Sequence, residues 1–165
     1  MYRVFHFSLE DWEIGTVIIP KKSDFNNPQK ERMESALEKN RLEFYNSFPS
    51  RLNCLFLAPT ISSAQQWCRS ININHWRQEK KEILFYVYEI EIEDKLLWFN
   101  ADKLVEFYLP NCDEINASHG YWKSVTEDVE QNDLLNLYES MTSNSVKIVG
   151  KTCYKIDING EIVEN

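Results

Sequence analysis

The chain has 165 residues, of which 43% are hydrophobic and 13% aromatic, and its 26 acidic and 18 basic residues give a formal net charge of -8. This length suits a single core, so we predict one domain over residues 1–165. The acidic excess argues against a protein that follows a long nucleic-acid backbone through nonspecific phosphate contacts. Apolar runs stay well short of the ~20 residues of a membrane helix, and the first residues lack a signal-peptide pattern. We therefore expect a cytoplasmic protein that does not associate with membranes.

The first third of the chain predicts two extended segments and a helix. Aromatic and β-branched residues predict a strand over 2–8, and residues 16–22 form a second short extended segment that stops near Pro20. Residues 28–45 have the apolar spacing of an amphipathic helix. Its apolar side comprises Met33, Ala36, Leu37 and Phe44.

Residues 53–68, "NCLFLAPTISSAQQWC", predict a buried strand that turns abruptly into a helix. The strand occupies 52–58 and the helix 61–70, with Pro59 or Thr60 at the helix entrance. Thr60 can accept hydrogen bonds from backbone amides that are otherwise unsatisfied at a helix start. This explains part of the corner and leaves open whether it also serves ligand binding.

The second half of the chain is richer in strands. Residues 82–94 alternate apolar and polar side chains, which is typical of a strand, and residues 96–109 fit either a strand with a short helix or one helix. The pattern of residues 111–124 predicts a loop around Gly120 with a short helical turn near Ile115. Two extended pieces then flank Asn159-Gly160, a strong hairpin signal. This mixed order predicts an α+β fold with mixed, largely antiparallel sheets and flanking helices.

Few residues form a recognisable chemical motif. Cys54, Cys68, Cys112 and Cys153 are widely separated without a paired CxxC or a histidine at ligand spacing, so we expect free thiols and no metal site. Dinucleotide, Walker, metalloprotease and hydrolase-elbow motifs are absent from the sequence. His6 lies on the strand face opposite Phe5 and Phe7 and shares that face with Ser8. A lone strand histidine is usually structural, but this pair leaves room for an imidazole and a hydroxyl to bind one ligand.

Three segments in order resemble histidine-type ADP-ribosyltransferases. "FHFS" resembles the first-strand motif of that family, whose histidine and hydroxyl hold NAD, and it places His6 and Ser8 in those roles. "LFLAPTISSAQQW" is similar to the family's strand, corner and helix, with Ala64 and Trp67 at the family spacing. "YESMTSNSVKIV" is similar to the third motif, in which a glutamate precedes a late strand, and it places Glu139 at the catalytic position.

The resemblance also implies the remaining site residues. "PSR", "ER", "LEKNR" and "YW" resemble a bacterial and phage branch of this fold. Arg51 is then expected to pair with the NAD diphosphate, with Arg41 a weaker candidate. Phe56 or Tyr121 is expected to stack on the nicotinamide. The second-motif tyrosine of the family is replaced by Phe56, and an asparagine, Asn144, stands where the family usually has glycine.

The implied activity is an NAD-dependent mono-ADP-ribosyltransferase, a glycosyltransferase that releases nicotinamide. Its acceptor is a protein, a nucleic-acid base or a small molecule, and the expected settings are a toxin or a phage-defence effector with an antitoxin or other protein partner. The alternative is a non-enzymatic interaction domain of the same fold, in which His6 and Glu139 are structural. A nuclease or phosphodiesterase requires a pair of histidines or a cluster of carboxylates, and the sequence contains neither pattern.

Overall fold

The computed structural model describes residues 1–22, 25, 27–79, 81–93, 95–129 and 137–165. The chain forms two compact units, and each is assembled from separate segments. The first unit contains Met1–Ile18, Leu57–Lys95 and Val146–Asn165, and the second contains Ile19–Phe56 and Leu96–Ser145.

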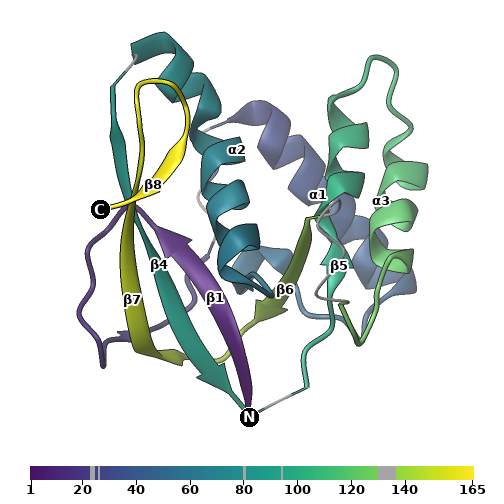
Figure 1. Ribbon diagram of the computed structural model, residues 1–165. Helices are drawn as coiled ribbons and strands as arrows, with labels where there is room; N and C mark the ends of the chain where they lie inside the picture. The colour runs from purple at the N-terminus through teal and green to yellow at the C-terminus, as the bar shows by residue number, and fades with distance from the viewer. Residues whose placement is uncertain (23–24, 26, 80, 94, 130–136) are drawn as a thin grey trace. The chain divides into compact units, whose positions relative to one another are not determined.

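The first unit is an antiparallel sheet with one long helix. Its strands are β1 (Tyr2–Ser8), β2 (Val17–Ile18), β4 (Ile83–Ile92), β7 (Val146–Ile156) and β8 (Ile162–Glu164). The strand order is β1-β4-β7-β2, with β8 also paired to β7. Helix α2 (Ile61–Glu79) packs against β1 and β4, as Figure 1 shows.

One hydrophobic cluster of the first unit lies between α2 and one face of the sheet. Alternation along β1 and β4 turns Phe5, Phe7, Phe85 and Val87 to this face, because paired residues in a ladder point the same way. Ala64 and Cys68 of α2 pack against these side chains and are fully buried. His6 and Ser8 consequently lie on the other face of the same sheet.

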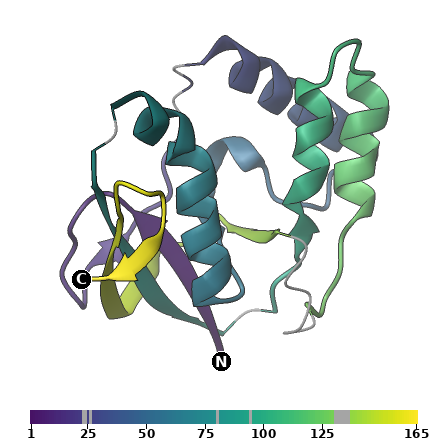
Figure 2. The same cartoon turned by 45° about the horizontal axis from the view of Figure 1, so that its top comes forward.

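The second unit combines helices with a short sheet. It contains α1 (Pro28–Phe44), the 3-10 helices η1 (Arg51–Asn53) and η2 (Ala101–Tyr108), and α3 (Glu114–Lys123). Its sheet has the order β3-β6-β5, from β3 (Leu55–Leu57), β6 (Tyr138–Thr142) and β5 (Phe99–Asn100). Figure 2 shows α1 and α3, which pack against each other. The last residue of β3, Leu57, already belongs to the first unit.

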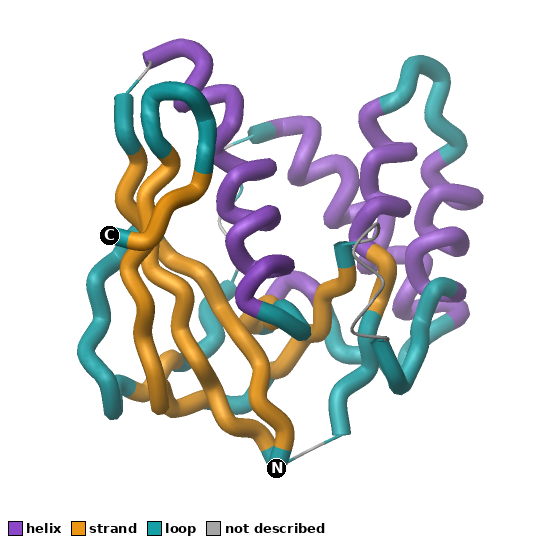
Figure 3. The backbone as a smooth tube through the Cα atoms, viewed as in Figure 1, coloured by secondary structure: helices purple, strands orange, loops and turns teal. Residues whose placement is uncertain are grey.

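The structure confirms the predicted α+β class. The strand pairs for which a register is given are all antiparallel, and Figure 3 shows the long strands of the first sheet and the short strands of the second. The corner after β3 forms as predicted, since the Thr60 hydroxyl accepts from the Ser63 amide at 3.1 Å at the start of α2. Residues 96–109 adopt the strand with a short helix, and the Asn100 side chain caps η2.

Three predictions of local structure were wrong. Residues 114–123 form α3 rather than a loop, and Gly120 lies inside this helix because Asp113 caps it and Tyr121 and Trp122 anchor it in the core. The strand predicted over 52–58 is shorter in the structure, where it is limited to β3, since residues 51–53 form η1. In α1, Phe44 is exposed. The buried face of α1 instead includes three polar residues, Glu34, Asn40 and Arg41.

Candidate functional site

Arg51 is the centre of a buried polar site in the second unit. It is the first residue of η1, and the Ser50 side chain caps this short helix by accepting from the Leu52 amide at 3.2 Å. Its side chain is only 4% exposed, which is unusual because a buried guanidinium must be fully compensated by partners. Those partners come from α1, α3, β3 and β6.

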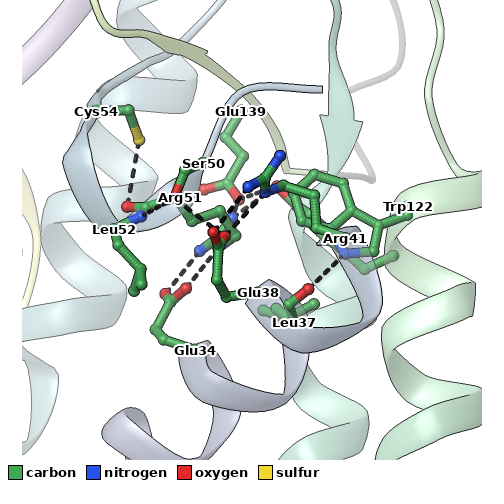
Figure 4. A network of polar contacts seen from close by, with 11 residues as sticks. Glu34, Leu37, Glu38, Arg41, Ser50, Arg51, Leu52, Cys54, Trp122 and Glu139 are labelled. Atoms are coloured by element: carbon green, nitrogen blue, oxygen red, sulfur yellow. Dashed lines mark hydrogen bonds and ion pairs between the residues drawn. The ribbon is translucent and has the colours of Figure 1, made fainter. Parts of the chain in front are cut away.

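Glu34 of α1 makes a two-pronged ion pair with Arg51. Arg51 Nε donates to Glu34 Oε2 at 2.8 Å, and Nη2 donates to Oε1 at 3.0 Å. The Glu34 side chain is also 4% exposed. Both carboxylate oxygens of Glu34 are therefore occupied, and the plane of the guanidinium is fixed by this fork-to-fork geometry, which Figure 4 shows.

Glu139 and Tyr121 bind the remaining side of the guanidinium. Arg51 Nη1 donates to the Tyr121 hydroxyl at 2.6 Å and also pairs with Glu139 Oε1. The Tyr121 hydroxyl in turn donates to Glu139 Oε1 at 2.7 Å. One oxygen of the Glu139 carboxylate is thus held from two directions, by a charged donor and by a phenol.

Two aromatic rings enclose the guanidinium. The Arg51 guanidinium carbon lies 4.7 Å from the centre of the Phe56 ring and 4.9 Å from that of Tyr121. Phe99 stacks on Tyr121 with ring centres 5.4 Å apart and planes at 19°. These contacts exclude water and strengthen the ion pairs. We call Glu34, Arg51, Phe56, Tyr121 and Glu139 the Arg51 cluster.

The electrostatics of the cluster keep Arg51 charged and Tyr121 protonated. Burial by itself disfavours the charged guanidinium, but Glu139, Tyr121 and Glu34 outweigh it and raise the pKa of Arg51 well above its ordinary value. Burial is the main reason why the pKa of Tyr121 is raised well above 10.0, and Glu139 adds to this rise. The phenol therefore remains a hydrogen-bond donor to Glu139 throughout the physiological pH range.

A second ion pair, between Arg41 and Glu38 of α1, supports the ion pair between Arg51 and Glu34. Arg41 donates to Glu38 through Nε at 2.9 Å and Nη2 at 2.8 Å, and the Ser50 hydroxyl donates to the same carboxylate at 3.0 Å. The hydrogen bond from Arg41 lowers the pKa of Glu38. Arg41 Nη1 also donates to the Phe48 carbonyl at 3.0 Å. These bonds fix the segment that leads into Arg51 (Figure 4).

One oxygen of the Glu139 carboxylate makes the contacts to the rest of the cluster. Oε1 accepts from Arg51 and Tyr121. The Glu139 side chain is only 5% exposed. A carboxylate in such surroundings is costly unless it is bonded, and these two donors hold the Glu139 carboxylate in place.

Four of the six predicted site residues meet in this cluster. Arg51, Phe56, Tyr121 and Glu139 were each selected from a different stretch of sequence, and the fold brings them into direct contact. Their contacts differ from the predicted ones, because Arg51 binds protein carboxylates and the two rings pack on its guanidinium. The roles in binding NAD stay predictions.

The other two predicted site residues belong to the first unit. His6 and Ser8 lie on the sheet face opposite α2, with Tyr88 and Tyr86 as their respective partners on β4. The His6 ring stacks on Trp12, with ring centres 6.1 Å apart and planes at 8°. The Ser8 hydroxyl accepts from the Glu10 amide at 3.0 Å.

Sequence reasoning missed Glu34 and Glu38, the carboxylates of α1. Acidic residues on an amphipathic helix normally face water, and Glu34 was assigned to that side. A signal was present, since Met33, Leu37 and Arg41 share one helical face and Glu34 lies on it. An acid inside an apolar stripe needs a buried cation, and "PSR" supplies one.

The described residues contain neither a helix long and apolar enough to cross a membrane nor a group of three or more histidine, cysteine or acidic side chains arranged to hold a metal ion. The four cysteines are free thiols. Cys54 and Cys68 are buried as expected, while Cys112 and Cys153 are partly exposed.

Comparison with curated proteins gave no match to this chain. Comparison with protein-family models gave a match over residues 17–149, which include the whole Arg51 cluster. Because this match covers well over half of the sequence, the chain belongs to the family described as protein of unknown function (DUF2441).

Proposed function

We propose that this protein is an NAD-dependent mono-ADP-ribosyltransferase and that Glu139 is its catalytic residue. The observation that carries the proposal is a buried carboxylate that is fixed in place. Glu139 Oε1 is held by Arg51 and Tyr121. A carboxylate fixed in this way is suited to bind a ribose hydroxyl and to face developing positive charge.

The reaction breaks the bond between the ribose C1′ and the nicotinamide nitrogen, and the bonding electrons leave with nicotinamide. The ribose then carries positive charge shared between C1′ and the ring oxygen. A nucleophilic atom of the acceptor bonds to C1′ and loses its proton to water or a base. The Glu139 carboxylate accepts a hydrogen bond from a hydroxyl of that ribose and stabilises the positive charge electrostatically.

The order of the secondary-structure elements supports this proposal. The three motif-like segments fall on β1, on β3 with the corner and α2, and on β6, which is followed by a turn and β7. Within the first unit, the backbone of Phe5 on β1 pairs with Ala58 at the corner, with N to O distances of 2.9 and 2.7 Å. β3 leads into this corner and pairs with β6, the strand of Glu139.

Within this proposal, Arg51 and Tyr121 are positioning residues for Glu139, and Phe56 shields the guanidinium. This differs from the diphosphate and stacking roles that the sequence resemblance implies. His6 and Ser8 keep the role of binding the dinucleotide. The acceptor is a protein side chain, a nucleic-acid base or a small molecule, and the setting is a toxin or a phage-defence effector.

Glu139→Gln tests the proposal. The amide oxygen can still accept from Tyr121 and Arg51, and Glu34 still compensates the guanidinium, so we expect the variant to fold. Release of free nicotinamide from NAD is measured by chromatography, with and without protein and RNA fractions of a bacterial lysate. We expect wild-type release that falls about 100-fold or more in the variant, the range for loss of one electrostatic contact to a transition state.

Glu43→Gln is the matched control. Glu43 lies on the exposed side of α1, and no ion pair joins it to a described residue. The Glu43→Gln substitution removes the same charge and leaves the Arg51 cluster unchanged, so nicotinamide release should match that of wild type. Wild-type release that persists in Glu139→Gln would contradict the catalytic role of Glu139.

A non-enzymatic interaction domain is the second candidate, and one observation favours it. The Arg51 cluster is nearly sealed, with side chains of Arg51, Glu34 and Glu139 only 4 to 5% exposed. A cluster with a purely structural role would have the same low exposure of these side chains. This candidate predicts that no fraction induces nicotinamide release, that NAD does not raise the melting temperature, and that Glu139→Gln affects stability alone.

A further inference from the structure

The sheet face opposite α2 in the first unit carries two cross-strand rows of polar and aromatic side chains. Register places His6, Tyr88 and Lys151 in one row across β1, β4 and β7. Ser8, Tyr86 and Cys153 form the next row. Flat rings, hydroxyls and an ammonium group thus lie side by side, whereas a solvent-facing sheet surface usually carries scattered charges.

Residues 9–13, which we call the strap, cover this face with an aromatic ring. Trp12 stacks on His6 and also lies against Tyr88, with ring centres 5.2 Å apart and planes at 31°. The Trp12 amide donates to the Tyr88 hydroxyl at 2.7 Å, and that hydroxyl donates to the Glu10 carbonyl at 2.7 Å. The indole is therefore held over the imidazole and the phenol by both stacking and hydrogen bonds.

The strap also supplies a negative charge. Asp11 forms an ion pair with Lys151 and a hydrogen bond with Tyr86, and Lys151 lies 5.0 Å from the centre of the Tyr86 ring. The hydrogen bond from Lys151 is the main reason why the pKa of Asp11 is lowered. The strap thus fills the face with a planar ring at one point and an anion at the next.

A planar ring joined to an anion is also the chemistry of a nucleotide. We propose that Asp11 and Trp12 act as an internal pseudo-ligand, occupying a nucleotide site on this face in which His6 and Tyr88 stack on the base and Lys151 and Tyr86 bind a phosphate. The proposal rests on the proposed function and deepens it, since it assigns NAD to this site and makes the strap its autoinhibitor.

The attachment of the strap is suited to release. Asp11 and Leu9 are exposed, while Trp12 is half-buried against His6 and Tyr88. Gly15 follows it with φ of 94°, and a Cβ at this position would meet nothing within 4 Å. This left-handed conformation strains other residues, so glycine provides a point about which the strap can swing. Exposed ion pairs such as Asp11 to Lys151 add only a small barrier to opening.

The test compares Asp11→Asn and Trp12→Ala with Glu43→Gln as the matched control. Glu43 is an exposed acid of α1, in the second unit, and no ion pair joins it to a described residue. NAD affinity is measured by calorimetry, and strap opening by hydrogen exchange of the residue 12 amide. Because apparent affinity scales with the open fraction, we expect NAD to bind about tenfold more tightly in both strap variants, with faster exchange. The control should match wild type.

Each other outcome is decisive. Equal NAD affinity in all four proteins would overturn the autoinhibitory strap and leave the proposed function intact. Weaker binding in Trp12→Ala would mean that the indole belongs to the binding site, which also overturns the strap proposal alone. Fast amide exchange in the strap variants without NAD binding by any protein would show an open face that does not take NAD, and the proposed function would fail.

Discussion

At the scale of single residues, the main feature of this protein is one guanidinium shared by two buried carboxylates. Arg51 satisfies both oxygens of Glu34 and one oxygen of Glu139, and the phenol of Tyr121 links the two sides. Removing one member of a buried charge network leaves its partners uncompensated, which costs far more than losing an exposed pair. The cluster is therefore both a candidate catalytic site and a structural requirement of the second unit.

Replacing Arg51 by methionine tests this dual role. The substitution keeps an unbranched side chain but leaves Glu34 and Glu139 buried without a cation, so we expect a loss of about 3 to 5 kcal/mol in the free energy of unfolding. Urea denaturation provides the measurement. The matched control is Arg3→Met. The Arg3 side chain is 64% exposed and pairs with Glu89 and Glu91. Its cost should stay within about 1 kcal/mol, and equal costs would contradict the role of Arg51.

At the scale of elements, helix caps decide where the site residues are placed. α3 brings Tyr121 into the cluster and is capped by Asp113, whose Oδ1 accepts from the amides of Ile115 at 3.2 Å and Asn116 at 3.1 Å. Ser50 performs the same function for η1, which positions Arg51. A capping side chain on the surface thus determines the direction in which a buried side chain points.

Asp113→Ala tests the contribution of the α3 cap. Loss of the two backbone hydrogen bonds should lower the free energy of unfolding by about 1 kcal/mol, measured by urea denaturation. Asp113→Asn is the control, because its amide oxygen can accept the same bonds and asparagine is an equally good cap. An asparagine variant as unstable as the alanine variant would show that charge, rather than capping, is responsible.

At the scale of the whole molecule, each unit is assembled from segments far apart in sequence. β7, which follows both long stretches of the second unit, pairs with β4 in the middle of the first sheet. Long-range pairing of this kind requires most of the chain before the sheet is complete. The stability of the molecule therefore depends on groups distributed over the whole sequence, including buried thiols in both units.

Two buried cysteines give the protein a predictable sensitivity to alkaline pH. Burial raises the pKa of the Cys54 and Cys68 thiols from 9.0 to about 12. Between these values the unfolded chain has released protons that the folded chain retains, so the free energy of unfolding falls as pH rises. At about pH 10 we expect each thiol to contribute a loss of about 1.4 kcal/mol relative to about pH 8.

Urea denaturation at the two pH values measures this effect, with Cys54→Ala/Cys68→Ala as the comparison. The double variant lacks both thiols, so its loss of stability over the same interval should be smaller by about 2 to 3 kcal/mol. Its lower stability at the starting pH does not matter, since only the change with pH is compared. An identical change in both proteins would contradict the assignment to these thiols.

Local signals in the sequence determined the α+β class, the strand over residues 2–8, the corner at Thr60 and the first half of α2, because alternation, capping and turn residues act over a few positions. The choice of Arg51, Phe56, Tyr121 and Glu139 came instead from the resemblance to ADP-ribosyltransferases. Local signals failed for α3, where Gly120 suggested a loop and the burial of Tyr121 and Trp122 outweighed its low helix propensity.

Only the tertiary structure decided which of these residues meet and what each one binds. Glu34 looks like a solvent-facing acid until α1 is packed against η1, and Arg51 looks like a phosphate ligand until its donors are seen to bind two carboxylates. Likewise, the sequence shows Trp12 near His6 but not that their rings stack. Partners of buried charges are set by packing between distant segments, and short-range sequence patterns contain no information about that packing.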